Sequence, residues 1–123
     1  MTEPAERRAA GLVVRAAGAR WLLPVAGVVA VLRQAEVIRV PGAAAAVKGL
    51  VHHRGRIIPV ADVIRALELP GASAAGTDLV VVDGPGGGRR FAVAVDAVIE
   101  LSAEPRTGLA ELDLARIAAA IFA

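Results

Sequence analysis

The sequence predicts a mostly β fold, either one β-barrel or two paired barrels, with a helix at its C-terminal end. Short apolar runs rich in β-branched residues recur along the chain and are separated by glycine-containing turns, which is typical of small barrels. Phe91, Val93 and Val95 alternate with small residues, the period of two expected for a strand with one packed face. Only residues 109–122 space their apolar side chains as a helix does.

The elements follow one another at short intervals. We expect the first strand at residues 12–15, a turn at 17–19, and further strands at 20–24, 28–32 and 37–40. Alanines at 43–47 favour one helical turn, and strands at 48–53 and 56–60 follow. Asp62 is a typical N-cap for a short helix over 63–67, and a loop of small residues covers 69–76. Strands at 79–83, 90–96 and 98–101 then precede the helix at 109–122, which is expected to begin near Thr107 and Gly108.

Bulk properties exclude several classes of protein. The 123 residues suit one domain or two small lobes that share a core, with residues 1–10 forming a flexible tail and residues 11–123 the domain. Cysteine is absent, so disulfides and thiolate chemistry are excluded. The net charge of +2 is spread along a chain with one Trp, two Phe and no Tyr, which does not fit a nucleic-acid interface.

A cytoplasmic protein is expected, without direct insertion into a membrane. The N-terminus carries acidic residues and lacks the apolar stretch of a signal peptide. The longest apolar run, residues 21–32, contains Pro24 and Gly27 and is too short to span a bilayer.

The most informative stretch is residues 48–62. Two apolar strands meet at Arg54 and Gly55, where glycine permits a turn that a Cβ would hinder. Pro59 cannot donate to a sheet ladder, so its strand should lie at an edge or carry a bulge there.

This stretch resembles the signature of the CheW-like family, the adaptors of bacterial chemotaxis arrays. The Lys48-Gly49 pair, the Arg54-Gly55 turn and the Pro59-Val60-Ala61-Asp62 ending occur in the family's order. Further similarities are Pro41 ahead of Lys48, the strand at 77–83, the Val-Asp-x-Val step at 95–98 and the Leu-Asp-Leu step at 112–114. The resemblance covers about residues 11–123 and implies two small SH3-like β-barrels packed together.

The chain also departs from the family pattern. His52 and His53 stand where the family often has Asn-Leu, and Ala30 stands where it has a Glu suited to pair with Arg54. The ionic partner of Arg54 is therefore open, with Glu36 as one candidate. The stretch 101–109 is shorter than the family norm, which implies a reduced barrel and a shortened C-terminal segment over about 104–123. The opened barrel edge is either covered by the C-terminal helix or used to bind a partner.

The resemblance implies a non-enzymatic adaptor that couples a CheA-type histidine kinase, through its regulatory domain, to the cytoplasmic hairpin of a chemoreceptor. The kinase domain would dock at the apolar edge of one lobe. The receptor helices would dock near a set of residues on the third strand and the Arg-Gly hairpin: Val28, Ala30, His52, His53, Arg54 and Gly55.

Taken alone, these residues leave other interpretations open. Arg54 is either a solvated turn cation or an interface arginine. His52 and His53 face opposite sides of a strand and no third histidine exists, so no metal site is expected. Ser73 and Ser102 have no histidine nearby in the sequence, and residues 84–88 lack the features of a phosphate loop, so neither a catalytic site nor a cofactor is expected. The alternative function is a β-barrel module that binds a small ligand or peptide. An enzyme using His52 or Asp62 ranks third.

Overall fold

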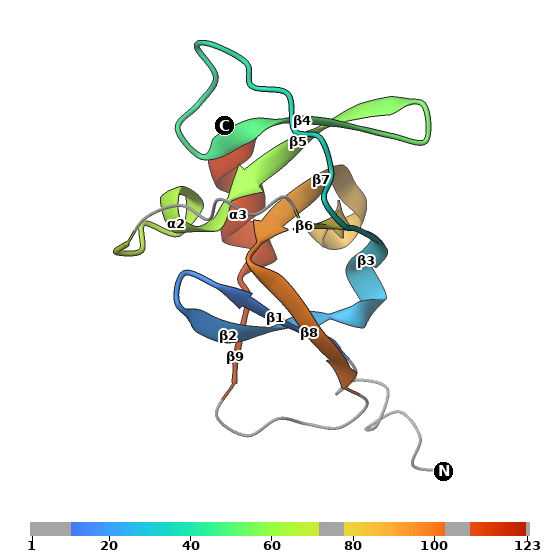
Figure 1. Ribbon diagram of the computed structural model, residues 1–123, viewed down its shortest axis with the longest axis vertical. Helices are drawn as coiled ribbons and strands as arrows, with labels where there is room; N and C mark the ends of the chain where they lie inside the picture. The colour runs from blue at the N-terminus through green and yellow to red at the C-terminus, as the bar shows by residue number, and fades with distance from the viewer. Residues whose placement is uncertain (1–10, 72–77, 103–108, 123) are drawn as a thin grey trace.

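The computed structural model describes residues 11–71, 78–102 and 109–122, which form two β-sheets and two short α-helices (Figure 1). The expected tail at 1–10, Ser73 and the helix start near Thr107 and Gly108 lie outside the described residues. The elements are β1 (Gly11–Ala16), β2 (Ala19–Pro24), η1 (Val25–Gly27), β3 (Val28–Leu32), β4 (Val47–His53), β5 (Arg56–Asp62), α2 (Val63–Ala66), β6 (Asp78–Gly84), η2 (Pro85–Gly87), β7 (Gly88–Val95), β8 (Ala97–Ser102), β9 (Ala110–Glu111) and α3 (Leu114–Ile121).

The smaller sheet has the strand order β8-β1-β2-β9, and the larger sheet has the order β3-β6-β7-β5-β4. Antiparallel hairpins build most of both sheets, because short turns join β1 to β2, β4 to β5 and β6 to β7. Two parallel pairings complete them: β9 adds to β2, and β5 adds to β7.

The larger sheet lies between two apolar clusters. Phe91, Val93 and Val95 of β7 face the first cluster, which also contains residues of β1, β2 and α3. Ala92 and Ala94 face the second cluster, which contains residues of β4, β5 and β6 and is flanked by β3. The strand therefore packs on both faces, and the prediction of one packed face was wrong. Large and small residues alternate along β7 because the large ones face the first cluster and the small ones, Ala92 and Ala94, face the second.

Two of the expected elements differ from the structure near the middle of the chain. The run 37–40 makes only a single antiparallel bridge, between Ile38 and Leu50, and is not a strand. Residues 43–47 do not form a helical turn. A turn in which the amide of Val47 donates to the carbonyl oxygen of Ala44 (2.9 Å) leads directly into β4. Tertiary pairing overrides the high helix propensity of alanine here.

The C-terminal helix is also shorter than expected. Ala110 and Glu111 pair with Trp21 and Leu22 as strand β9, so the helix begins only at Leu114. Asp113 accepts a hydrogen bond from the Arg116 amide (3.0 Å) and fixes this start. The main packing partners of α3 are α2, β5, β6 and η2, so the helix does not cover the outer edge of β8. Among the described residues, no helix is both long enough and apolar enough to cross a membrane.

Candidate functional site

The hairpin of β4 and β5 ends in a two-residue turn that presents Arg54 to solvent. Arg54 and Gly55 both have left-handed backbone conformations, with φ of 52° and 77°. This combination is that of the tight hairpin turns whose twist matches the flanking strands, and it strongly favours glycine at one position. The turn predicted from the sequence is confirmed, and it places Arg54 at the tip of the β4–β5 hairpin.

The tip of this hairpin extends beyond the body of the larger sheet (Figure 1). The strand β5 pairs with β7 only over Val60, Ala61 and Asp62. Opposite Pro59, both polar backbone groups of Leu50 bond to Ile38 (2.8 Å each), so they point away from β5. The nitrogen of Pro59 therefore faces away from β4, on the side where pairing with β7 has not begun. The expectation that this strand lies at an edge is wrong for β5 as a whole, because β5 lies between β4 and β7; only the part up to Pro59 lacks pairing with β7.

A close backbone approach explains the glycine of the Lys48-Gly49 pair. A Cβ built on Gly49 would lie 2.5 Å from the carbonyl oxygen of Ile38 and 2.7 Å from Cγ1 of Val37. Glycine thus lets the segment that connects β3 to β4 lie against β4, where Ile38 bridges to Leu50. The register shift between Val47 and Gly49 shows that the bulge in this hairpin lies in β4 and not at Pro59.

His52 and His53 occupy opposite faces of β4, as their adjacent positions predict. His52 is exposed, whereas His53 is 9% exposed. Burial lowers the pKa of His53, and the positive charges of Arg54 and Arg90 lower that pKa further. His53 is therefore a neutral inner residue that supports the hairpin near its tip, and His52 is the histidine available to a partner.

An apolar groove, named here the β3–β4 groove, lies between β3, the connecting segment and β4. Its volume is about 450 Å³, and its lining includes Val31, Leu32, Ile38 and His52. Side chains that bury well in proteins are open to solvent at or near this groove: Val31 is 36% exposed, Ile38 is 55% exposed, and Ile57, paired with His52, is 56% exposed. Arg33 and Glu36 add charges of both signs to the lining. An apolar patch with a charged rim is the usual anatomy of a protein-binding surface.

The residues singled out in the sequence do not all gather at this groove. His52 lines it, and Arg54 and Gly55 lie at the hairpin tip beyond it. Val28 is half-buried against the first cluster, and Ala30 is half-buried against the second. Within the described ranges, neither Glu36 nor any other acid forms an ion pair with Arg54.

The exposed apolar residues Val31, Ile38 and Ile57 were not singled out from the sequence. Adjacent residues of a strand face opposite sides, so the burial of Ile58 was the one indication in the sequence that Ile57 would be exposed. For Ile38, nothing in the strand expected at 37–40 indicated that its side chain would be exposed to solvent.

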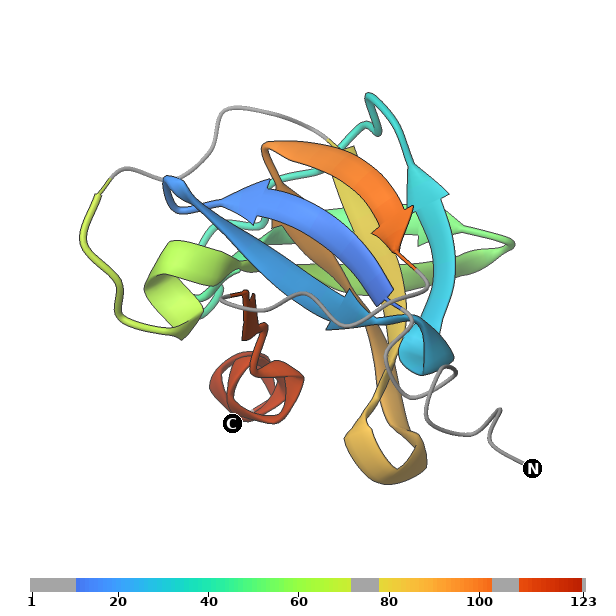
Figure 2. The ribbon, with the colours of Figure 1, turned by 90° about the horizontal axis from the view of Figure 1, so that it is seen from below.

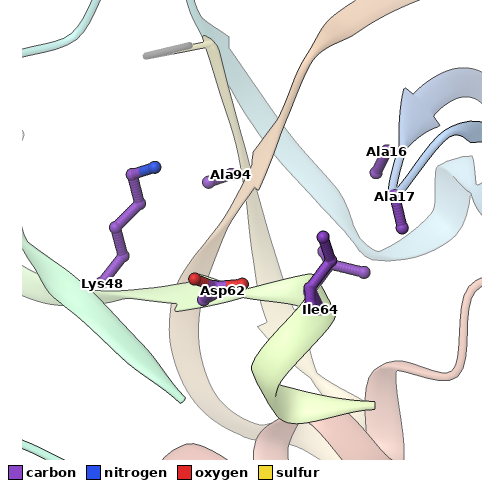
Figure 3. A pocket seen from close by; sticks show the side chains of 7 residues that line it. Ala16, Ala17, Lys48, Asp62, Ile64 and Ala94 are labelled. Carbon is purple, nitrogen blue, oxygen red and sulfur yellow. The ribbon is translucent and has the colours of Figure 1, made fainter. Parts of the chain in front are cut away.

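The cavity at the junction of the two sheets is too small for an organic ligand (Figure 3). Lys48, Asp62 and Ile64 line one side of it, and Ala16 and Ala17 of the β1–β2 hairpin line the other. Its volume of about 10 Å³ has room for at most one water molecule. In the part of the chain that the structure describes, no three His, Asp or Glu residues are grouped to hold a metal ion.

The structure is thus a small two-sheet β domain with an apolar groove at one sheet edge and an arginine at the tip of a hairpin. The chain belongs to the CheW-like domain family, whose family model matches residues 10–117. Among solved structures it is similar to the scaffolding protein CheW of Thermoanaerobacter tengcongensis, with 21% sequence identity and a TM-score of 0.69. That match covers 80% of this chain and 67% of the other. Comparison with curated proteins finds no match. The predicted family and the mostly β fold with a C-terminal helix are thus confirmed; the described residues form two sheets that are consistent with the paired barrels of the family, and neither sheet closes into a barrel.

Proposed function

We propose that this protein is a non-enzymatic adaptor that couples a CheA-type histidine kinase to the cytoplasmic hairpin of a chemoreceptor. Membership of the CheW-like family supports a chemotaxis scaffold role. The strongest structural support for the proposal is the β3–β4 groove, where apolar side chains are exposed beside the β4–β5 hairpin.

The receptor hairpin docks at the β3–β4 groove. A helical tip would cover Val31, Ile38 and Ile57, and burial of apolar side chains from water is the main favourable term in such contacts. Arg54 lies at the adjacent hairpin tip with no ion pair to a described residue, so its guanidinium is available for an acidic group of the partner. Arginine at the margin of an apolar patch is a common binding hot spot.

The kinase regulatory domain docks at the outer edge of β8. Among the described residues, β8 pairs only with β1, and α3 packs elsewhere. Leu101 on β8 is 65% exposed, the highest value among the large apolar side chains of the described residues. An exposed strand edge with an exposed leucine is a template for contact with another β domain.

Two separate surfaces on one rigid core explain how an adaptor transmits a signal without chemistry. The core between the sheets is closely packed, so the groove and the β8 edge keep a fixed relation. A receptor state that binds the groove more tightly then changes how the kinase is held, because only a difference in affinity shifts an equilibrium.

Two of the cavities do not favour the small-ligand form of the alternative function, a β-barrel module that binds a small ligand or peptide without chemosensory partners. The cavity between the sheets holds at most one water molecule, and the β3–β4 groove is open and apolar, which suits a protein segment better than a small polar ligand.

Calorimetric titration of a receptor hairpin fragment into the protein tests the proposal. Arg54→Ala should weaken binding by at least ~1 kcal/mol, a cost that fewer than about a third of interface residues reach on truncation to alanine. Arg20→Ala is the matched control, since Arg20 is an exposed arginine beside the turn of the β1–β2 hairpin. Equal affinities for the two variants, with both folded, would contradict the role given to Arg54.

A further inference from the structure

A second groove lies on another part of the molecule and is distinct from both proposed docking surfaces. It is named here the η1–η2 groove, and it forms where η1, the β6–η2 turn and the β9–α3 junction meet. Figure 2 shows η2 and α3 projecting on the same side of the sheets. The groove has a volume of about 580 Å³, within the range of sites that hold drug-sized ligands or short peptide segments.

The charge of this groove is opposite to that of the protein. The chain carries a formal net charge of +2, yet the groove lining contains Asp83, Glu111 and Asp113 and no Lys, Arg or His. Glu111 is exposed and forms no ion pair with a described residue. Arg90 offsets the charge of Asp83, and the carboxylates of Glu111 and Asp113 leave the lining with a negative charge that favours a cation.

The other two carboxylates retain capacity for a ligand. Asp83 pairs through Oδ1 with Nε of Arg90 at 2.9 Å, and its side chain remains 51% exposed. Asp113 uses Oδ1 to cap α3. Because a carboxylate has two acceptor oxygens, each residue keeps one for a further donor.

Apolar walls complete the groove. Pro24 and Pro85 border it, and Leu112 and Leu114 contribute from the β9–α3 junction. An occupant that matches this lining needs cationic groups next to small apolar ones. The size and open shape of the groove suit an extended chain better than a single small amine.

We propose that the η1–η2 groove docks an extended cationic segment of a partner protein, in which Arg or Lys side chains alternate with apolar ones. Guanidinium or ammonium groups of the segment donate to Glu111, Asp83 and Asp113, and its apolar side chains cover the prolines and Leu114. This surface is separate from the receptor and kinase surfaces, so it gives the adaptor a third point of attachment.

The test is an NMR titration of the full chain with the synthetic peptide acetyl-Ala-Arg-Leu-Arg-Ala-amide. The peptide with Glu in place of each Arg is the control ligand. Amide shifts at Gly84, Gly86, Gly87 and Ala115 with the Arg peptide alone support the proposal. Binding should weaken as salt is raised, because the contacts are solvent-exposed charge pairs.

Variants locate the binding. Glu111→Gln should weaken the Arg peptide about threefold, the effect of one exposed charge pair. Ala115→Arg, at an exposed helix position where arginine is well tolerated, should abolish binding. Asp96→Asn removes the same charge at the far end of β7, roughly 25 Å from η2 by strand rise, and should have no effect.

Three results would overturn the proposal: equal shifts with both peptides, shifts confined to other surfaces, and a loss of binding in Asp96→Asn equal to that in Glu111→Gln. Binding that appears only after Arg7 and Arg8 are replaced by alanine would also overturn it, since the occupant would then be this chain's own N-terminal segment.

Discussion

Replacement of Gly49 by alanine tests the packing on which the β3–β4 groove depends. The added Cβ would lie 2.5 Å from the Ile38 carbonyl oxygen and 2.7 Å from Val37 Cγ1. Because the nearest atom belongs to the backbone, the segment at 37–38 must move away from β4. That movement breaks both hydrogen bonds between Ile38 and Leu50, each 2.8 Å long.

The expected cost follows from these contacts. Overpacking of a tight site costs about 1–3 kcal/mol, and each lost hydrogen bond costs about 1 kcal/mol. The lower entropy of the unfolded alanine chain offsets about 0.5–1 kcal/mol. Gly49→Ala should therefore lower the free energy of unfolding by about 2–4 kcal/mol, which corresponds to a fall of roughly 10 °C in Tm for a chain of this size.

Urea unfolding followed by circular dichroism measures this loss, and Gly27→Ala is the matched control. A Cβ on Gly27 would meet only the Asp83 carbonyl oxygen at 3.7 Å, an ordinary contact, so its stability should change by less than about 0.5 kcal/mol. If the two alanine variants unfold at the same urea concentration, the close approach at Gly49 is not the reason for glycine there.

Three further changes have defined outcomes. The pKa of His53 is lowered in the folded protein, so the unfolded chain takes up a proton at a higher pH, and the free energy of unfolding should fall as the pH drops below the ordinary pKa of 6.5. Urea unfolding at two pH values measures this loss. His53→Gln should remove the loss, and His52→Gln, at an exposed site, should retain it. Asp113→Ala should lower the free energy of unfolding by about 1 kcal/mol through loss of the α3 cap, and Asp113→Asn should preserve it; equal loss in both would contradict the capping role. Phe122→Leu should lower the free energy of unfolding by about 1–2 kcal/mol in the same assay. It removes the edge contact with the Phe91 ring (6.0 Å between centroids) and the stacking of Arg89 (Cζ 4.0 Å from the Phe122 ring centroid). An unchanged urea midpoint would show that these contacts contribute nothing.

Local signals in the sequence were sufficient for most of the strands and for the Arg54-Gly55 turn. The preference of β-branched residues for strands and of glycine for a left-handed φ depends only on residues close in the sequence, so the hairpin of β4 and β5 was predictable without a structure. The cap at Asp62 was predictable for the same reason, and its carboxylate accepts from the Arg65 amide at 3.2 Å.

Long-range pairing decided the elements that were predicted wrongly. The alanines at 43–47 favour a helix locally, but Val47 is drawn into β4. Residues 110–111 continue a helical pattern in the sequence, yet they pair with the edge of β2 and form the strand β9. The β3–β4 groove was not predictable either, because it joins Val31 and Ile38 to His52 across more than a dozen residues of intervening chain.

Reconstitution of kinase control tests the central claim most directly. The autophosphorylation rate of a CheA-type kinase from the same organism is measured with its chemoreceptor, in the presence and absence of this protein. If the protein is an adaptor, the receptor should change the kinase rate only when the protein is present, and Arg54→Ala should weaken this coupling whereas Arg20→Ala should not. If the receptor controls the kinase equally well without the folded protein, or not at all with it, the adaptor role is contradicted.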